Sequence, residues 1–330
     1  MANKLIVIVG ITGNQGASVA DVFLKEPGYK VRGISRDPSK GSSKAWSDKG
    51  VEMVAGDLND VESIKAAFKG ANVIYGVTDF WQGSRDPANH AKAKEQGRTI
   101  NEVLYDIEVQ QGRNIVDAAA TVVDTLDRFV LSTLSHSAKW SQGKITFNLH
   151  FDAKWMAVEY LRATYPELAK KTSYVQIGFF AQNWQGGPTT APRKQPDGTY
   201  KLHVPMSGDS KFPMVDPRRD AGHFTKALVD VEPGKVLIGA GSFLSWKEWC
   251  EMWSKHTGKT IVYEEADPME LENAMPGGMG KELADMFRYI DHYGYDGRDP
   301  DVVYPWDLGV NVPVTTIEEY IKETDWSSVL

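Results

Sequence analysis

Cysteine is almost absent from this chain of 330 residues, which contains only Cys250. A single cysteine cannot form an internal disulfide and brings no second thiolate to a metal site, so a disulfide-stapled fold is excluded and a reducing compartment is favoured. Long hydrophobic runs are also lacking. The apolar stretch at residues 5–9 is too short for a transmembrane helix or the core of a signal peptide. We therefore expect a cytoplasmic protein with no membrane span.

The chain also lacks an excess of basic residues. It has 37 Lys and Arg against 44 Asp and Glu, a formal net charge of -7, so direct binding to nucleic acid or to anionic lipids is disfavoured. Six of its histidines show no metal-ligand spacing, and we expect no metal site. These six are His90, His136, His203, His223, His256 and His292. With 42% hydrophobic and 25% charged residues, the composition is that of an ordinary globular protein.

The first half alternates short runs rich in Val and Ile with longer helical patterns, which is typical of βαβ units around a parallel sheet. Helices are expected at Asn14–Lys25 and Lys94–Ala120. Strands are expected at Lys4–Val9, Lys30–Ser35, Val51–Val54, Val73–Val77, Arg128–Ser132 and Ser173–Ile177. The pattern predicts the α/β class, with a doubly wound parallel sheet of the Rossmann type.

The alternation of strand and helix patterns ends after about Trp184, where Gly and Pro residues indicate loops and turns. Capping-box spacings at Ser245 and Thr316 open later helices. We therefore expect a nucleotide-binding domain at residues 1–183, with a late segment near 213–240 as a further source of core strands. A smaller α+β domain for substrate or partner, at residues 184–330, would form the cleft. Eight of the ten tryptophans lie beyond residue 139, and they either fill this domain's core or line the cleft.

A glycine-rich segment directly follows the first expected strand and opens the first expected helix. It reads Gly10-Ile-Thr12-Gly13-Asn14-Gln15-Gly16. Gly10 allows a tight turn, Gly13 lets the backbone approach a pyrophosphate, and Gly16 lets helix and strand pack closely, while the helix N-terminus faces the phosphate charge. The spacing is the variant seen in short-chain dehydrogenases. It predicts a dinucleotide site in which Thr12, Asn14 and Gln15 also contact the cofactor.

The end of the second strand bears on the choice of cofactor. Arg36 stands where an NAD enzyme usually carries an acid, and Lys40 follows. A guanidinium suits a 2'-phosphate, so NADP(H) is the preferred cofactor. Asp37 keeps NAD(H) as an alternative, and a solvated surface loop is the other explanation of the basic residues. Further cofactor contacts are expected after the third and fourth strands, at Asp57, Leu58, Val77, Thr78, Asp79 and Phe80.

These motifs, together with His150-Phe-Asp-Ala-Lys154 and the final Thr-Ile-Glu-Glu-Tyr run, resemble the NmrA-like family of atypical short-chain dehydrogenases and reductases. The resemblance spans most of the chain. It implies a Rossmann domain with a smaller C-terminal domain, and binding of NAD(P). It also implies one of two roles, since some members are regulators that sense the cofactor and bind proteins, whereas related proteins are reductases.

The catalytic prediction rests on His150 and Lys154. Ordinary short-chain dehydrogenases place Tyr-x-x-x-Lys here; this chain keeps the lysine and has histidine in place of tyrosine. Four residues along a helix put both side chains on one face. Imidazole titrates near neutral pH, so His150 could donate a proton to a carbonyl or imine while Lys154 binds the nicotinamide ribose. The alternative is that His150 is only a hydrogen-bonded residue at a helix start.

Other predicted site residues follow the fifth and sixth strands. Ser132 and Thr133 come where short-chain dehydrogenases hold a carbonyl-polarising serine, although hydroxyls are also common turn residues. Gly178 and Phe179 should form the wall beside the nicotinamide. The expected substrate contacts are His150, Phe80, Phe180, Asn183 and Trp184.

Two functions remain open from the sequence. The first is an NADPH-dependent reductase of a small, mostly apolar carbonyl, imine or enone. The second is a non-catalytic NADP sensor that binds a regulatory protein partner, for which a nuclear location is the alternative. The sequence leaves the choice between monomer and dimer open.

Overall fold

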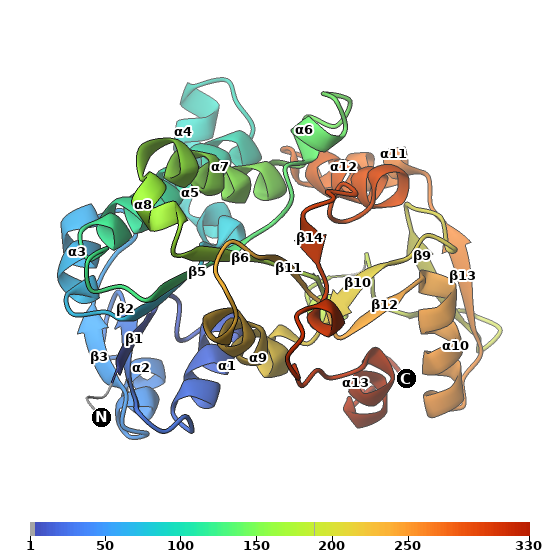
Figure 1. Cartoon of the computed structure of the whole chain (residues 1–330). Coiled ribbons are helices and arrows are strands. Elements are labelled where there is room, and N and C mark those ends of the chain that lie inside the picture. The colour runs from blue at the N-terminus through green and yellow to red at the C-terminus, as the bar shows by residue number, and fades with distance from the viewer. Residues whose placement is uncertain (1–3, 188) are drawn as a thin grey trace.

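The computed structural model describes residues 4–187 and 189–330; residues 1–3 of the predicted first domain and Pro188 of the predicted loop region lie outside this range. An eight-stranded parallel sheet forms the centre, in the order β14-β11-β6-β5-β4-β1-β2-β3 (Figure 1). Its strands are β1 Lys4–Ile8, β2 Tyr29–Ser35, β3 Glu52–Ala55, β4 Val73–Gly76, β5 Arg128–Thr133, β6 Thr172–Ile177, β11 Val236–Gly239 and β14 Val302–Val303. The α/β class and the doubly wound parallel sheet are confirmed.

Helices cover both faces of this sheet. On one face α1 (Asn14–Phe23) and α9 (Pro217–Asp230) pack on the strands through Val19, Phe23 and Phe224. On the other face lie α3 (Val61–Phe68), α5 (Ile100–Ala120) and α7 (Leu149–Thr164), whose apolar side chains form a second buried cluster. Because both faces are covered, the strands consist of nearly continuous apolar runs, as the sequence pattern indicated.

The long helix predicted at Lys94–Ala120 is wrong as a single element. The chain forms α4 at Pro87–Glu95 and then a separate α5 that begins at Ile100. Gly97, with φ of +63°, ends the first helix. Thr99 and Glu102 then form a reciprocal capping box that starts the second. The apolar periodicity hid this boundary because buried residues occur on both sides of it.

The C-terminal part adds two small sheets to one end of the main sheet. One contains β7 (Phe179–Phe180), β10 (Phe212–Val215) and β12 (Ser242–Leu244), and the other contains β8 (Arg193–Lys194), β9 (Tyr200–Val204) and β13 (Ile261–Glu265). Its helices are α10 Trp246–Thr257, α11 Pro268–Ala274, α12 Met279–Tyr293 and α13 Ile317–Glu323. The remaining short helices are η1 Phe80–Arg85, η2 Ala181–Gln185, η3 Pro305–Asp307, α2 Gly41–Ser47, α6 Ser137–Trp140 and α8 Pro166–Ala169.

The boundary predicted at residues 183 and 184 stays a prediction, and the main sheet takes in strands from beyond it. β11 pairs with β6, and β14 pairs with β11. β11 lies within the late segment that the sequence suggested, whereas β10 joins a separate sheet. α9, which packs against β5, β6 and β11, also comes from beyond residue 183.

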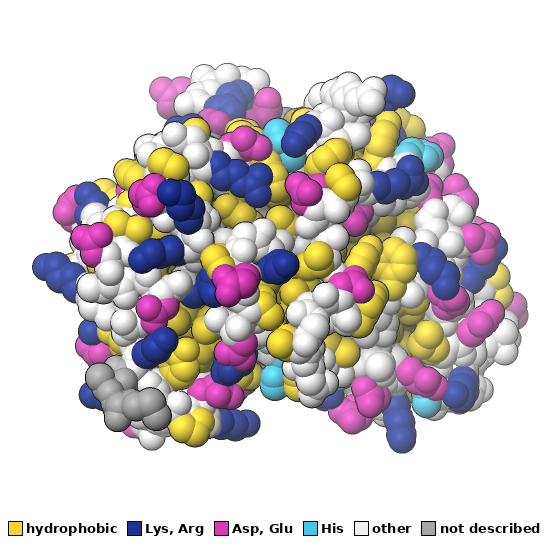
Figure 2. Space-filling view, in the orientation of Figure 1, with side chains coloured by type: hydrophobic (Ala, Val, Ile, Leu, Met, Phe, Trp, Pro, Cys, Tyr) yellow, Lys and Arg dark blue, Asp and Glu magenta, His cyan; other side chains and the backbone are white. Residues whose placement is uncertain are grey.

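Among residues 4–187 and 189–330, no helix is long and apolar enough to cross a membrane. On the face shown in Figure 2, acidic and basic side chains are interspersed with one another.

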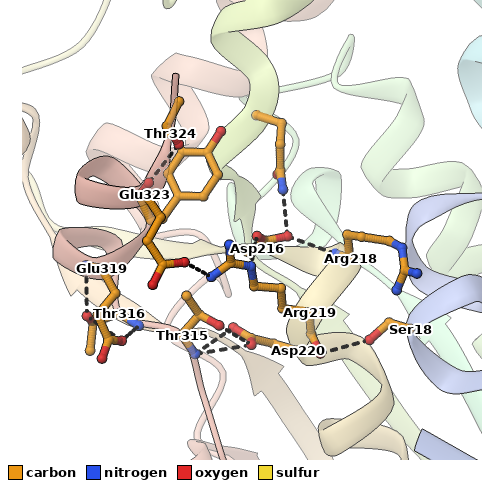
Figure 3. A network of polar contacts seen from close by, with 12 residues as sticks. Ser18, Asp216, Arg218, Arg219, Asp220, Thr315, Thr316, Glu319, Glu323 and Thr324 are labelled. Carbon is orange, nitrogen blue, oxygen red and sulfur yellow. Dashed lines mark hydrogen bonds and ion pairs between the residues drawn. The ribbon is translucent and has the colours of Figure 1, made fainter. Parts of the chain in front are cut away.

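A polar network fastens the C-terminal segment to α9 (Figure 3). Asp220, 1% exposed, accepts hydrogen bonds from the backbone N–H and the hydroxyl of Thr315, at 3.0 and 2.8 Å. Arg219 pairs with Asp216 at 3.2 Å and with Glu323 of α13 at 2.6 Å. The Ser18 hydroxyl of α1 donates a hydrogen bond to the backbone carbonyl oxygen of Arg219 on α9. α9 therefore joins the C-terminal helix to the helix that follows the glycine loop.

Burial raises the pKa of Asp220 from the ordinary 3.8 to about 6. The folded chain therefore binds the proton of the Asp220 carboxyl group more tightly than the unfolded chain. The protonated carboxyl group stabilises the fold fully below pH 3.8, and this stabilisation is lost as the pH rises through 6. We expect Asp220→Asn, which cannot ionise, to become more stable relative to wild type by about 2–2.5 kcal/mol between pH 4 and pH 8. Urea denaturation at several pH values measures this difference. Asp230→Asn, which removes a half-exposed carboxylate at the other end of α9, is the control.

Candidate cofactor and catalytic site

A cavity of about 700 Å³ lies at the carboxyl ends of β1, β2, β3, β4 and β6. In doubly wound sheets this edge is where ligands bind. The cavity brings together most of the residues singled out from the sequence. Those that line it are Gly10, Thr12, Gly13, Asn14, Gln15, Gly16, Arg36, Lys40, Asp57, Leu58, Val77, Thr78, Asp79, Phe80, His150, Lys154, Gly178, Phe179, Phe180 and Asn183. Their roles remain predictions; their proximity is a property of the fold.

The glycine loop has the shape that a diphosphate requires. Gly10 has φ of +67°, and a Cβ on Gly16 would lie 2.3 Å from the Gly10 carbonyl oxygen, so both positions need glycine. α1 starts at Asn14 without a side-chain cap and without an acidic residue in its first turn. Its first amide hydrogens are therefore available to an anion, and the helix dipole favours negative charge there. This cradle fits the pyrophosphate of a dinucleotide.

The end of the cavity that follows β2 is basic and open. Arg36 is exposed and, in the described part of the chain, has no protein partner for its guanidinium; Lys40 is also exposed. Asp37, the acid that could bind a ribose hydroxyl, accepts at Oδ1 from the backbone N–H and hydroxyl of Ser39, at 3.0 and 2.6 Å. The Ser39 hydroxyl is the largest cause of the lowered pKa of Asp37. One carboxylate oxygen of Asp37 therefore already accepts hydrogen bonds within the loop, whereas the Arg36 guanidinium makes no hydrogen bond to the described residues.

Lys154 projects from α7 into the other end of the cavity. Its ammonium donates to the Thr78 carbonyl oxygen at 2.9 Å and contacts the carboxylate of Glu108. The Thr78 hydroxyl donates to the same carboxylate at 2.6 Å. Glu108 lies on α5 and is 1% exposed, and no residue in the described part of the chain donates to its Oε2. The buried carboxylate holds the ammonium at the end of β4, where a nicotinamide ribose would lie.

His150 lies one turn before Lys154 on α7 and is 7% exposed. Its Nδ1 is 2.7 Å from Glu282 Oε1, and its backbone N–H donates to the same oxygen at 2.8 Å. The rings of Phe80 and Trp81 have their centroids 5.9 and 5.2 Å from the imidazole. Among the described residues Nε2 has no hydrogen-bond partner, and the ring lines the cavity. His150 can therefore exchange a proton with a molecule in the cavity through Nε2.

Three predicted site residues do not line this cavity. The Ser132 hydroxyl donates to Gln15 Oε1 at 2.8 Å, as does the Tyr75 hydroxyl at 2.6 Å, so Ser132 orients a loop residue. The Thr133 hydroxyl donates to the Leu134 carbonyl. Trp184, expected to contact the substrate, packs against Trp326 with the ring centroids 4.5 Å apart and the planes inclined by 32°, and its indole N–H donates to the Tyr320 hydroxyl. Its indole is wide and apolar enough to be held in the C-terminal core instead.

Sequence reasoning missed the two carboxylates, Glu108 and Glu282, that bind the candidate catalytic pair. Glu108 shares the buried stripe of α5 with Leu104 and Ile115. Glu282 is fully buried on α12, one turn from Met286. A carboxylate within an apolar helical stripe is costly unless it is paired, and this was the available signal.

Comparison with known proteins adds family and fold. The sequence profile of the NmrA-like family matches residues 2–321. An oxidoreductase of Aspergillus hancockii with an NmrA-like domain is 33% identical over 286 residues, covering 81% of this chain and 76% of that protein. The structure of the negative transcriptional regulator NmrA in complex with NADP superposes with a TM-score of 0.69, at 19% identity over 98% of this chain and 95% of that one. An NADPH-dependent quinone oxidoreductase of Escherichia coli, complexed with NADPH, gives 0.68 at 18% identity, over 96% of this chain and 98% of that one.

Proposed function

Because the chain belongs to the NmrA-like family, we propose that it is an NADPH-dependent reductase of a small, mostly apolar carbonyl, imine or enone. One observation carries the proposal. His150, with a free Nε2, and Lys154 line the same cavity as the glycine loop. Relatives named as oxidoreductases, including one of Aspergillus flavus that is 27% identical over 79% of this chain, support the same reaction class.

Most of the residues that line the cavity would bind the cofactor, and His150 would transfer a proton. The glycine loop binds the diphosphate, Arg36 and Lys40 bind the 2'-phosphate, and Lys154 donates hydrogen bonds to the ribose hydroxyls. When bound, NADPH supplies a hydride to the carbon of the substrate double bond. His150 then delivers a proton from Nε2 to the atom that gains negative charge, oxygen or nitrogen for a carbonyl or imine.

The substrate end of the cavity is largely aromatic. Phe80 and Trp81 contact the His150 ring, and Phe179, Phe180 and Met286 line the same cavity. Such a lining excludes water and favours a flat apolar compound over a sugar or a phosphorylated metabolite. A panel of quinones, enones, aldehydes and cyclic imines, with NADPH oxidation followed by absorbance, tests the proposal. Substrate-dependent turnover supports it, and no turnover across the panel contradicts it.

We expect Arg36→Ala to weaken NADPH binding at least tenfold more than NADH binding. A charge-assisted contact to phosphate contributes about 1.5–3 kcal/mol, and 1.4 kcal/mol corresponds to tenfold. Titration calorimetry with both cofactors measures the ratio. Lys49→Ala, whose ammonium pairs with Asp21 away from the cavity, is the matched control. Equal losses for the two cofactors would show that Arg36 does not bind the 2'-phosphate.

A non-catalytic NADP sensor that binds a protein is the second candidate, and one observation favours it. Phe243 and Trp306 are 43% and 62% exposed, and both rings contact that of Tyr304, so an aromatic surface is open on the C-terminal part. A sensor requires a partner whose affinity differs between the apo and the NADP-bound chain. Equal capture in both states removes this candidate.

A further inference from the structure

We propose that Glu282 is a positioning residue that holds the His150 ring in one tautomer and stabilises its positive charge. The inference rests on the proposed reductase function and concerns a residue outside the cavity lining. Glu282 comes from α12 in the C-terminal part, 132 residues from the histidine it contacts. Glu282 would then support the His150–Lys154 pair, although it lies far from the His-Phe-Asp-Ala-Lys motif in the sequence.

The tautomer follows from the donors around the carboxylate. Glu282 Oε1 accepts the backbone N–H of His150 at 2.8 Å, and Oε2 accepts the Asn101 side-chain amide at 3.2 Å. Both oxygens thus serve as acceptors, so the 2.7 Å contact to His150 Nδ1 is satisfied when Nδ1 carries the hydrogen. In the neutral ring Nε2 is then a bare lone pair, and in the charged ring it carries the proton to be delivered.

The surroundings make this contact rigid. Glu282 is fully buried, and its two hydrogen-bonded neighbours lie on different helices, α5 and α7. The imidazole is also in contact with the rings of Phe80 and Trp81. In such a setting a carboxylate interacts strongly with a charge on the ring. Other charged groups on the surrounding elements are Lys154 and Asp79, which line the cavity, Glu108 on α5, Asp152 on α7, and Lys281 and Asp285 on α12.

In each turnover, the substrate would gain one hydride from the cofactor and one proton from His150. The carbonyl carbon gains a hydride from the bound cofactor, which is oxidised as the carbonyl is reduced. The C–O π bond breaks, and its oxygen takes the proton from His150 Nε2, leaving a neutral ring with hydrogen on Nδ1. Water then returns a proton to Nε2. Glu282 keeps its two acceptor contacts throughout and stabilises the charged ring that exists before each transfer, as the carboxylate of a catalytic triad does.

The test compares Glu282→Gln, which removes the charge and keeps the shape, with Asp285→Asn as the matched control. Asp285 is a buried carboxylate on the same helix that pairs with Arg288 and accepts the Phe147 N–H, without contacting His150. For Glu282→Gln we expect kcat to fall at least about tenfold with KM for NADPH unchanged. We also expect the basic limb of its pH–rate profile to move to lower pH. Asp285→Asn should show none of these changes.

A second readout needs no turnover. Nitrogen-15 NMR of histidine-labelled full-length protein, with the His150 signals assigned by their loss in His150→Gln, reports which ring nitrogen carries hydrogen. We expect Nδ1–H in the wild type and a mixture of tautomers in Glu282→Ala. Should Glu282→Ala not fold, the wild-type spectrum and the Glu282→Gln kinetics still decide.

The possible failures can be told apart. Hydrogen on Nε2 in the neutral wild-type ring, or a Glu282→Gln enzyme with wild-type kcat and pH profile, would overturn the positioning role and leave the reductase proposal standing. A wild-type protein that binds NADPH with hydrogen on Nδ1 but turns over no substrate supports the positioning of the ring and overturns the reductase proposal.

Discussion

His150→Gln should lower kcat for NADPH-dependent reduction by about 100-fold or more and leave NADPH affinity within about threefold. A positioned proton donor contributes roughly 10²–10⁴ to the rate. Glutamine keeps a polar side chain of similar length, and its amide can still pair with Glu282, but it cannot deliver a proton. Lys154 and the glycine loop, which would hold the cofactor, are unchanged. The loss should therefore fall on kcat.

Steady-state kinetics with the best substrate of the panel measures this loss, and titration calorimetry measures NADPH affinity. His90→Gln serves as the control because His90 is exposed at α4 and does not line the cavity. A His150→Gln enzyme that retains wild-type kcat would show that this histidine is only a structural residue at the start of α7. Water or another group would then supply the proton.

Lys154→Met should lower the free energy of unfolding by about 3–5 kcal/mol and abolish NADPH binding. The stability loss follows from Glu108, which is 1% exposed and would lose the ammonium that neutralises it. Breaking one side of a buried ion pair leaves an uncompensated charge away from water, and the cost is of this size. The binding loss follows from the missing donor to the ribose.

The double variant Lys154→Met with Glu108→Gln separates the two effects. Removing the buried charge should recover most of the stability, whereas NADPH binding and turnover should stay absent because the ammonium is still missing. Urea denaturation and titration calorimetry give the two quantities. If the single variant were as stable as wild type, the Lys154–Glu108 pair would not have the role in stability that its burial suggests.

The N-terminal half of the fold was predicted well from the sequence because its signals are local. Val- and Ile-rich runs, and the glycine loop between strand and helix, depend on neighbours within a few residues. β14 was missed, since two residues, Val302 and Val303, carry no periodic pattern. The small C-terminal sheets are stabilised by contacts between distant aromatic residues such as Tyr200 and Trp253, which no local window contains.

The candidate site shows the same division. Lys154 and His150 were found because they stand at the positions of the Tyr-x-x-x-Lys pattern of short-chain dehydrogenases, and because a helix places residues four apart on one face. Glu108 and Glu282 were missed because their pairing depends on how α5 and α12 pack against α7. Trp184 was assigned to the substrate from its place shortly after the sixth strand, whereas its indole packs against Trp326 and does not line the cavity.

The central sheet combines strands from the N-terminal and C-terminal parts of the chain, and this affects how the protein folds during synthesis. β11 and β14 form one flank of the sheet beyond β6, and α9 covers part of one face, yet all three lie beyond residue 216. While a nascent chain is still shorter than this, β6 presents an unpaired edge and the sheet an uncovered apolar face, both of which favour aggregation. The central sheet therefore reaches its final form only after most of the polypeptide has left the ribosome.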